Sequence, residues 1–341
     1  MIRMELEKNS YDIVIERGSL ERAGNYLKLD RKVMIITDEG VPRQYAETIK
    51  AQAKEGFIKV VPQGEGSKSL QTAEEILTEM LSRQFSRKDA VVSVGGGVVG
   101  DLGGFVASLY MRGIDFYNVP TTVLSQVDSS IGGKTAVNLA GIKNIIGAFY
   151  QPKKVLIDSD TLSTLSQRQI TNGLVEAIKM GATSDKVLFD MFLDDTWRNQ
   201  LDTVIERALL VKKYVVEQDE KESHLRKILN FGHTIGHGFE SAAKGKLLHG
   251  ECVALGMLYM SSPKMQCNLK KIYKNVGFEA PDLSGIDIKA VKEAITHDKK
   301  AANKRCDVVY VEEIGNGIID TWSMEQVLDR LEGDIHEKCV W

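Results

Sequence analysis

The sequence predicts an α/β fold in which a mostly parallel sheet, with helices on its faces, is followed by a mainly α-helical half. Three observations lead to this prediction. Short β-branched runs alternate with amphipathic stretches up to about residue 160, which is typical of parallel strands joined by crossover helices. Helical patterns dominate after that point, and a glycine-rich turn joins one predicted strand to the next helix. For a chain of 341 residues we expect two domains, 1–158 and 159–341.

The strands of the first half are predicted from apolar runs bounded by Gly, Pro, Asp or Thr. They cover residues 33–36, 58–61, 90–94, 116–119 and 155–157. Helices are expected over 73–85 and 101–110, and an additional strand pair over 1–6 and 11–16. Because ligands of such sheets gather at the carboxyl ends of the strands, we expect a binding site there.

The second half is predicted to be helical, with one late hairpin. The helices are expected over 167–183, 201–217, 227–243, 251–268 and 288–298. The hairpin is expected over 306–311 and 317–321, around a Gly-Asn-Gly turn. A cleft between the two halves is the expected active site.

Composition and charge restrict the possible partners. The formal net charge is -3, so no overall positive field favours nucleic acid or an anionic membrane. No apolar run reaches the roughly 18 residues that a membrane span needs. The four cysteines lack CxxC spacing, and the charged N-terminus resembles no signal peptide. We therefore expect a cytoplasmic enzyme with reduced thiols, and any anionic substrate would need a local cluster of Lys and Arg.

The glycine-rich turn, residues 95–104, holds six glycines between a predicted strand and a predicted helix. Gly95, Gly97 and Gly100 match G-x-G-x-x-G, where backbone N–H groups and the helix dipole suit a pyrophosphate. This predicts dinucleotide binding, and a tight turn that binds nothing is the alternative.

The surroundings of this turn depart from the usual dinucleotide fingerprint. The turn follows the third strand of the parallel series, and Thr121 and Thr122 stand where the next strand would end in an acid. The acidic candidate for ribose binding is instead Asp38, at the end of an earlier strand. A second loop, residues 63–68, also ends a strand and could add ribose and phosphate contacts.

Histidines predict a metal site in the second half. His233 and His237 are four residues apart on a predicted helix, so both rings leave the same face, and His249 follows closely. Glu176 is the candidate carboxylate, with Lys179 on the same helix face. Two His and one carboxylate are typical of catalytic zinc with an open position. Spacing alone would instead pair His233 with His237 on the metal, and a lone helical His is usually structural.

Several cations are candidates for binding an anionic substrate. Lys134 is expected in the glycine-rich turn 128–138, and Lys143 in a second loop with Asn144. Lys212 and Arg226 flank the polar run 219–222 ahead of the histidines. A phosphate site is one interpretation of these residues, and a solvated surface is the other.

Six motifs in order resemble the 3-dehydroquinate synthases, a family of sugar phosphate cyclases. They are GGGVVGDLGGFVA from residue 95, YMRG from 110, VPTTVLSQVDSSIGGK from 119, KNIIGAFYQP from 143, NFGHTIGH from 230 and LHGE from 248. The resemblance runs from the first strand to about residue 300, nearly the whole chain. The loop 139–142 departs from the His-Pro-Leu-Gly form commoner in the family, and we assign it no role.

The resemblance implies a Rossmann-like NAD-binding domain followed by a zinc- and substrate-binding domain. It implies that the ligands of zinc, or of another divalent metal such as cobalt, are Glu176, His233 and His249. It implies that His237 contacts the substrate instead of the metal. The implied catalytic residues are Asp128, Lys134, Lys179 and His237. The implied substrate contacts are Arg112, Asn144, Lys212, Arg226, Asn230 and the pair Lys299 and Lys300. The implied NAD contacts are Asp38, Glu65, Lys68, Gly97, Val98, Val99, Gly100, Asp101, Thr121, Thr122, Lys134, Lys143, Thr161 and Thr164.

The activity implied by the resemblance is the conversion of 3-deoxy-D-arabino-heptulosonate 7-phosphate to 3-dehydroquinate and phosphate, in the shikimate pathway of aromatic amino acid biosynthesis. NAD would act through transient oxidation, and a homodimer is implied, with a small sugar phosphate rather than nucleic acid or membrane as partner. The alternatives are another sugar phosphate cyclase, a metal-dependent polyol dehydrogenase of related fold, and a non-catalytic NAD-binding paralogue.

Overall fold

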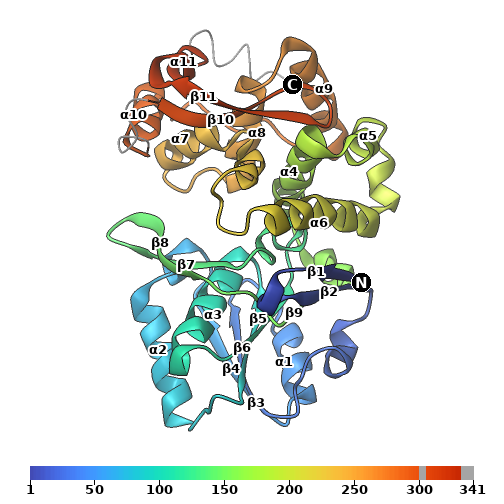
Figure 1. The fold of residues 1–341 in the computed structure, drawn as a ribbon, viewed down its shortest axis with the longest axis vertical. Helices are drawn as coiled ribbons and strands as arrows, with labels where there is room; N and C mark the ends of the chain where they lie inside the picture. Colours follow the sequence, from blue (N-terminus) through green and yellow to red (C-terminus); the bar gives the residue numbers. More distant parts are fainter. Residues whose placement is uncertain (299–304, 332–341) are drawn as a thin grey trace. The chain divides into compact units, whose positions relative to one another are not determined.

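The computed structural model describes residues 1–298 and 305–331. The chain divides into two compact units, Met1–Leu165 and Ser166–Trp341. Figure 1 shows a sheet with flanking helices in the first unit and mostly helices in the second. The predicted α/β class is therefore confirmed.

The first unit is built on a seven-stranded sheet with the order β1-β2-β9-β6-β5-β3-β4. Its strands are β1 (Ile2–Met4), β2 (Tyr11–Ile15), β3 (Lys32–Asp38), β4 (Glu55–Val61), β5 (Ala90–Gly95), β6 (Asp115–Pro120) and β9 (Lys154–Ile157). Every neighbouring pair is parallel except β1 with β2. All the strands predicted for this sheet are present.

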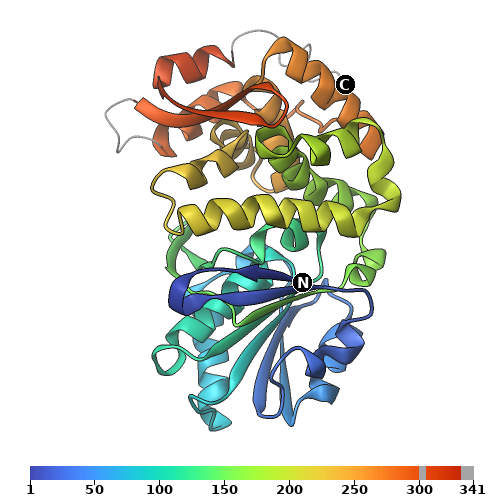
Figure 2. The same ribbon diagram turned by 45° about the vertical axis from the view of Figure 1, so that its right-hand side comes forward.

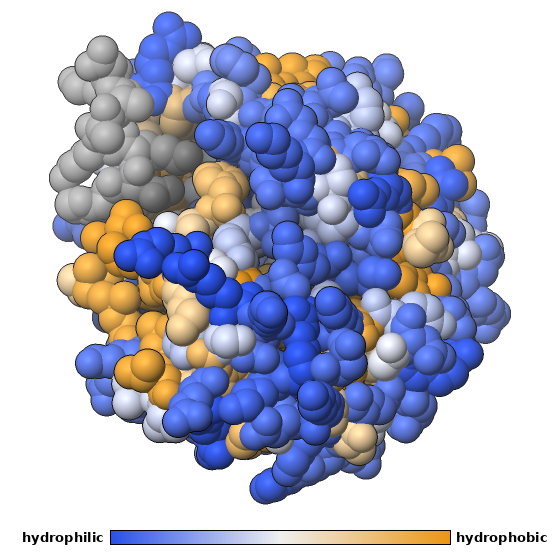
Figure 3. Space-filling view, turned by 60° about the horizontal axis from the view of Figure 1, so that its bottom comes forward, coloured by the Kyte–Doolittle hydropathy of each residue, from blue (hydrophilic) through white to orange (hydrophobic). Residues whose placement is uncertain are grey.

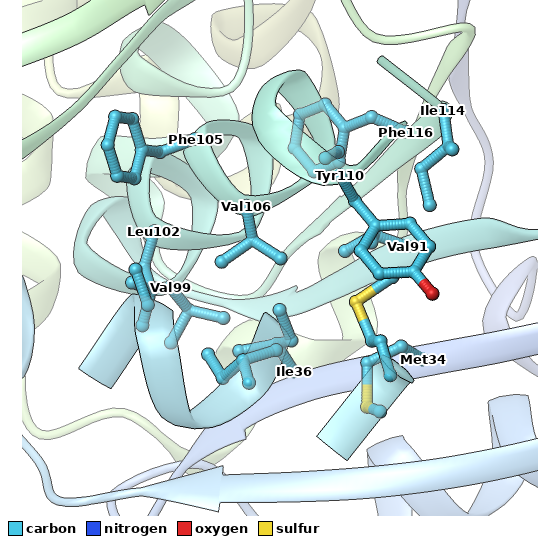
Figure 4. Close-up of a cluster of buried hydrophobic side chains, with 14 of the residues drawn as sticks. Met34, Ile36, Val91, Val99, Leu102, Phe105, Val106, Tyr110, Ile114 and Phe116 are labelled. Carbon is cyan, nitrogen blue, oxygen red and sulfur yellow. The ribbon is translucent and has the colours of Figure 1, made fainter. Parts of the chain in front are cut away.

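Helices cover both faces of this sheet, which explains why its strands are almost continuously apolar. Alternate residues of β3 face opposite sides: Met34 and Ile36 pack with α2 (Leu70–Ser82) and α3 (Gly97–Leu109), as Figure 4 shows in part. Val33 and Ile35 pack with α1 (Arg43–Gln52) on the other side. Figures 1 and 2 show these helices on the two sides of the sheet. The helices α2 and α3 were predicted, and α1 was not.

A separate hairpin, β7 (Lys134–Leu139) with β8 (Ile142–Phe149), corrects two predictions. Lys143 and Asn144, expected in a loop, lie in β8, and Lys134 begins β7 just after the glycine turn instead of lying within it. The physical reason is the two-residue turn at Ala140 and Gly141, whose φ angles of 51° and 81° suit a tight hairpin. Ala at such a position gives no turn signal in the sequence.

The second unit contains eight α-helices and one hairpin among its described residues. The helices are α4 (Gln167–Ser184), α5 (Lys186–Leu193), α6 (Leu201–Gln218), α7 (His233–Ala243), α8 (His249–Tyr259), α9 (Pro263–Val276), α10 (Ile288–Asp298) and α11 (Met324–Asp329). The hairpin of β10 (Arg305–Glu313) and β11 (Asn316–Ser323) confirms its prediction.

Two predicted helices of this unit are each broken. The helix expected over 227–243 is a 3-10 segment, Leu225–Asn230, followed by α7, because Gly232 has a left-handed φ of 79°. The helix expected over 251–268 is α8 followed by α9. Ser262 caps α9 and Pro263 occupies its first position, which is a common way to begin a helix.

Within residues 1–298 and 305–331, no helix has the length and apolar character that crossing a bilayer requires. The cytoplasmic location expected from the sequence stays a prediction.

Candidate functional site

The carboxyl edge of the first unit's sheet gathers the residues expected to contact NAD. Because β3, β5 and β6 are parallel, Asp38, Gly95 and Thr121 come to the same edge, and the Thr121 N–H donates to the Gly95 carbonyl over 3.0 Å. The helix α3 begins at Gly97, directly after β5. Its first N–H groups have no acceptor within the helix, so this edge offers unpaired donors and a positive dipole end.

Close packing accounts for part of the glycine content of this turn. A Cβ atom on Gly103 would overlap the Ser93 hydroxyl, and one on Gly104 would overlap the Thr135 side chain. These glycines therefore let α3 approach β5 and β7. They are a structural requirement, separate from any ligand at the start of the helix.

Asp38, the candidate ribose ligand, is buried at the end of β3. Burial raises the pKa of its carboxyl group, although the Gly40 and Val41 amides partly oppose this. The Gly40 N–H donates to Asp38 Oδ1 over 2.8 Å.

Lys68 connects residues that the sequence assigned to different ligands. Its buried ammonium group donates to Asp101 Oδ2 over 2.7 Å and to Asn144 Oδ1 over 2.5 Å, and lies 3.6 Å from Glu65 Oε1. Asn138, which the sequence did not single out, donates to Glu65 Oε1 over 2.9 Å and accepts the Asn144 N–H over 2.8 Å. The hairpin and the loop before α2 are thus held together.

The other predicted site residues of this unit lie in short segments and turns. Asp128 lies in a π-helical turn, Ser125–Ser129, and Arg112 in a 3-10 segment after α3. Lys134, Lys143 and Arg112 are exposed. Thr161 and Thr164 lie in a 3-10 segment, where the Tyr45 hydroxyl is 3.3 Å from the Thr161 carbonyl oxygen and 3.4 Å from the Thr164 hydroxyl.

Glu176, His233 and His249 meet in the second unit. They come from α4 and from the first residues of α7 and α8, three helices in which α8 packs against both of the others. The His233 and His249 Nε2 atoms lie 3.8 and 3.4 Å from Glu176 Oε1. One donor atom from each of the three residues lies within 4.8 Å of the others. The structure therefore brings together the ligand set implied by the resemblance.

The hydrogen bonds of the two rings leave the same nitrogen of each for a ligand. His233 Nδ1 lies 3.2 Å from the Phe231 carbonyl oxygen, and His249 Nδ1 lies 3.1 Å from Glu240 Oε2. Because a carbonyl or carboxylate oxygen only accepts, each Nδ1 carries a proton, so Nε2 is the nitrogen of each ring that a metal would bind, in place of any proton on it. Glu176 Oε1 is buried, and no described residue donates a hydrogen bond to it. Two imidazoles and this carboxylate fit zinc or cobalt.

Lys179 sets the charge state of this cluster. Its ammonium group forms an ion pair with Glu176 Oε2 one helical turn away, with both side chains buried. Burial by itself would raise the pKa of Glu176, but Lys179 and the two histidines outweigh it and hold that pKa well below its usual range. Burial, with Lys179, lowers the pKa of His233 well below normal. Burial also lowers the pKa of His249, but Glu176 and Glu240 outweigh it and raise that pKa to about 9.

His237 is exposed beside this cluster, with its ring centroid 5.3 Å from that of His233 and 6.0 Å from that of His249. A second possible donor group joins His237, Glu240 and His249. It lacks a fully buried carboxylate, whereas Glu176 is 0% exposed. The group of Glu176, His233 and His249 is therefore the better metal site. It does not include His237, which spacing alone would have paired with His233 on the metal.

The cations expected to bind substrate are buried in this unit. Lys179, Lys212 and Arg226 are 1%, 6% and 2% exposed, which is unusual for charged side chains. Arg226 Nη1 donates to the Glu220 carbonyl over 2.5 Å, and Asn230 Nδ2 donates to Glu222 Oε1 over 2.9 Å. The remaining predicted substrate contacts, Lys299 and Lys300, lie outside the described residues.

Comparisons with known proteins agree along the whole chain. Residues 58–172 match the model of the 3-dehydroquinate synthase N-terminal region, and 173–301 match that of the C-terminal region. The 3-dehydroquinate synthases of Streptococcus mutans and Streptococcus thermophilus are 38% and 41% identical to the chain, over 97% of its length and 99% of theirs.

Solved structures of sugar phosphate cyclases are also similar. A 2-deoxy-scyllo-inosose synthase with carbaglucose-6-phosphate, NAD+ and Co2+ has a TM-score of 0.87 at 25% identity, covering 98% of this chain and 99% of that one. A 2-epi-5-epi-valiolone synthase from Streptomyces hygroscopicus with NAD+ and Zn2+ has a TM-score of 0.84 at 25% identity, covering 96% and 97%. A probable glycerol dehydrogenase from Sinorhizobium meliloti, at 17% identity and a TM-score of 0.60, shares the fold alone. The chain therefore belongs to the 3-dehydroquinate synthase family.

Proposed function

We propose that this protein converts 3-deoxy-D-arabino-heptulosonate 7-phosphate to 3-dehydroquinate and phosphate, with NAD and a divalent metal as cofactors. Its family membership supports this activity. The single observation that supports the metal dependence concerns Glu176 Oε1. This atom is buried, accepts no hydrogen bond from the described residues, and faces the Nε2 atoms of His233 and His249. Lys179 pairs with the other oxygen, Oε2, so Oε1 is the atom whose burial a bound cation would offset.

When bound, NAD supplies a reversible hydride acceptor, and zinc or cobalt supplies Lewis acidity at a substrate oxygen. Asp38 and the first amides of α3, at the carboxyl edge of the sheet, would hold the cofactor's ribose and pyrophosphate. Glu176, His233 and His249 would hold the metal.

The side chains of the protein have separate tasks in this proposal. Lys179 favours the ionised form of Glu176, which is the form that binds a metal. Lys212 and Arg226, already desolvated, supply positive charge to the phosphate and carboxylate of the substrate. His237, exposed beside the cluster, would hold or pass a proton.

The chemistry that follows is set by the substrate. Oxidation of the C5 alcohol acidifies the C–H bond at C6, so the C–O bond to phosphate breaks by β-elimination. The ketone is then reduced again, which leaves NAD unchanged overall, and ring opening and aldol closure complete the product. Because phosphate leaves by elimination, the enzyme is a carbon–oxygen lyase. Holding one conformer of the open chain favours closure.

Two other activities make different predictions. Another sugar phosphate cyclase would release phosphate from a different sugar phosphate and not from the heptulosonate. The curated 3-dehydroquinate synthases are about 40% identical to this chain, against 25% for the inosose and valiolone synthases, which favours the proposed substrate. A polyol dehydrogenase would accumulate one NADH for each substrate oxidised.

The test is phosphate release from 3-deoxy-D-arabino-heptulosonate 7-phosphate by the purified protein, with and without NAD and a metal chelator. We expect release that needs NAD, stops with the chelator, returns with zinc or cobalt, and leaves no net NADH. Release in no condition would refute the proposed activity, and release that the chelator does not affect would refute the metal dependence.

We also propose a homodimer. Apolar side chains gather on parts of the surface, as Figure 3 shows. On β8, Ile142, Ile145 and Phe149 are 58%, 55% and 47% exposed. Exposed apolar side chains grouped in this way are typical of a surface that binds another protein chain. Light scattering coupled to gel filtration should give twice the mass of the chain, and a monomer at micromolar concentration would contradict the proposal.

A further inference from the structure

Glu240 contacts the metal cluster but is not one of its three ligands. Its Oε2 atom lies 3.1 Å from His249 Nδ1, while His249 Nε2 faces Glu176 over 3.4 Å. We propose that Glu240 is a positioning residue: its carboxylate accepts the Nδ1–H of His249 and so fixes the tautomer and orientation that keep Nε2 toward the metal. The inference rests on the metal site proposed above.

The two histidines are oriented in different ways. His233 is fixed locally, because the Phe231 carbonyl accepts its Nδ1–H from only two residues away. His249 is the first residue of α8, and its partner comes from another helix, α7. Glu240 follows His233 by seven residues, or two helical turns, so both lie on the same face of α7. One helix therefore supplies a ligand and also the carboxylate that orients the ligand of its neighbour.

The surroundings make this hydrogen bond stronger than an exposed one would be. The side chains of Glu240 and His249 are 20% and 32% exposed, so water competes only in part for the carboxylate. A carboxylate behind a ligating imidazole raises the basicity of the ligand nitrogen and limits ring rotation. Losing such a partner typically weakens metal binding by about 10- to 100-fold.

The rival interpretation makes Glu240 a ligand itself, together with His237 and His249. The ring geometry favours the positioning role, because one His249 nitrogen faces Glu240 and the other faces Glu176. The two interpretations differ in the effect of substitutions. A ligand is lost when its carboxylate becomes an amide or a methyl group, whereas an amide oxygen can still accept the Nδ1–H of His249.

The experiment measures Co2+ binding to the metal-stripped full chain, by competition with a chromophoric chelator and by the visible absorption band of bound Co2+. The variants are Glu240→Gln and Glu240→Leu, with Glu206→Gln, an exposed acid on α6, as the matched control. We expect Glu240→Leu to weaken binding by about 10- to 100-fold with the same absorption band once saturated. Glu240→Gln should fall between wild type and Glu240→Leu, and Glu206→Gln should match wild type.

Other results would contradict either the positioning role of Glu240 or the metal site itself. Co2+ affinity of Glu240→Leu equal to that of Glu206→Gln would overturn the positioning role. An altered band in both Glu240 variants at saturation would make Glu240 a ligand and also overturn it. If Glu240→Leu does not fold, Glu240→Gln decides, because it keeps the shape of the side chain. A wild-type protein that binds no Co2+ would refute the metal site of the proposed function, which is a distinguishable failure.

Discussion

Gly256 tests whether the metal centre depends on the close approach of two helices. It lies on α8 and faces the backbone at the start of α7. A Cβ atom added there would overlap the Gly232 carbonyl oxygen and lie 2.8 Å from both the Gly232 carbonyl carbon and the Gly236 nitrogen. These are backbone atoms, so no side chain can rotate away. Gly256→Ala must therefore move α7 and α8 apart.

The size of the effect follows from these distances. Ordinary contact begins at 3.4 Å, so 2.8 Å requires a displacement of at least about 0.6 Å, and relief of the overlap with the carbonyl oxygen requires more. Metal–ligand distances tolerate only about 0.2 Å, and His233 and His249 are on the two helices that separate. We expect Co2+ affinity to fall by about 10- to 100-fold. We also expect unfolding free energy to fall by about 1–3 kcal/mol, the usual cost of overpacking.

The assay combines Co2+ competition with urea denaturation of the metal-free protein. Gly285→Ala is the control, because its nearest neighbour would be the flexible Lys246 Nζ at 3.5 Å. That variant should match wild type in both measurements. Wild-type Co2+ affinity together with unchanged stability in Gly256→Ala would show that the close helix contact does not define the site.

Three further predictions concern the ligands of the metal and of NAD. Glu176→Ala should abolish turnover and retained metal, measured by phosphate release and elemental analysis, and an active, metal-loaded variant would remove Glu176 from the ligand set. Asp38→Asn should weaken NAD binding by about 10- to 100-fold in a calorimetric titration, since a hydrogen bond to a charged group contributes about 1.5–3 kcal/mol. Asp38→Asn should not lower the free energy of unfolding. The control is Asp30→Asn, at an exposed position, which should leave NAD affinity unchanged. Because burial raises the pKa of Asp38 from its ordinary 3.8, wild-type NAD affinity should fall as the pH drops through that raised value. The raised pKa also contributes stability to the fold below the ordinary pKa, and this contribution is lost as the pH rises through the raised one. A pH dependence of NAD affinity that is identical in wild type and Asp38→Asn would contradict the assignment of Asp38.

Much of the secondary structure of the first unit could be predicted because it depends on local sequence. Strands covered on both faces must be apolar at nearly every position, and such runs are easily found. The helix α1 was missed although its buried residues, Tyr45, Ala46 and Ile49, have helical spacing. They are too few to stand out from polar neighbours. The β7–β8 hairpin was missed because its turn lacks the usual Asn-Gly signal.

The metal site could be predicted only in part from local sequence. Spacing placed His233 and His237 on one helix face, but the choice between them depends on where α4 brings Glu176, which no local pattern contains. Glu240 was missed, although its position seven residues after His233 puts it on the same helix face. That spacing indicates a possible partner, and only the packing of α8 against α7 identifies which ring it contacts.

The positions of His233 and His249 at the first residues of α7 and α8 have an electrostatic consequence. The N-terminus of a helix carries partial positive charge, so each disfavours a nearby cation by about 0.3–1 kcal/mol and favours an anion by a similar amount. A metal ion between two such ends therefore needs negative charge close to it, which Glu176 and Glu240 supply. Lys179 already neutralises part of the charge on Glu176. A substrate with its own negative charge would complete the balance, which favours the proposed phosphorylated, carboxylated sugar over a neutral polyol.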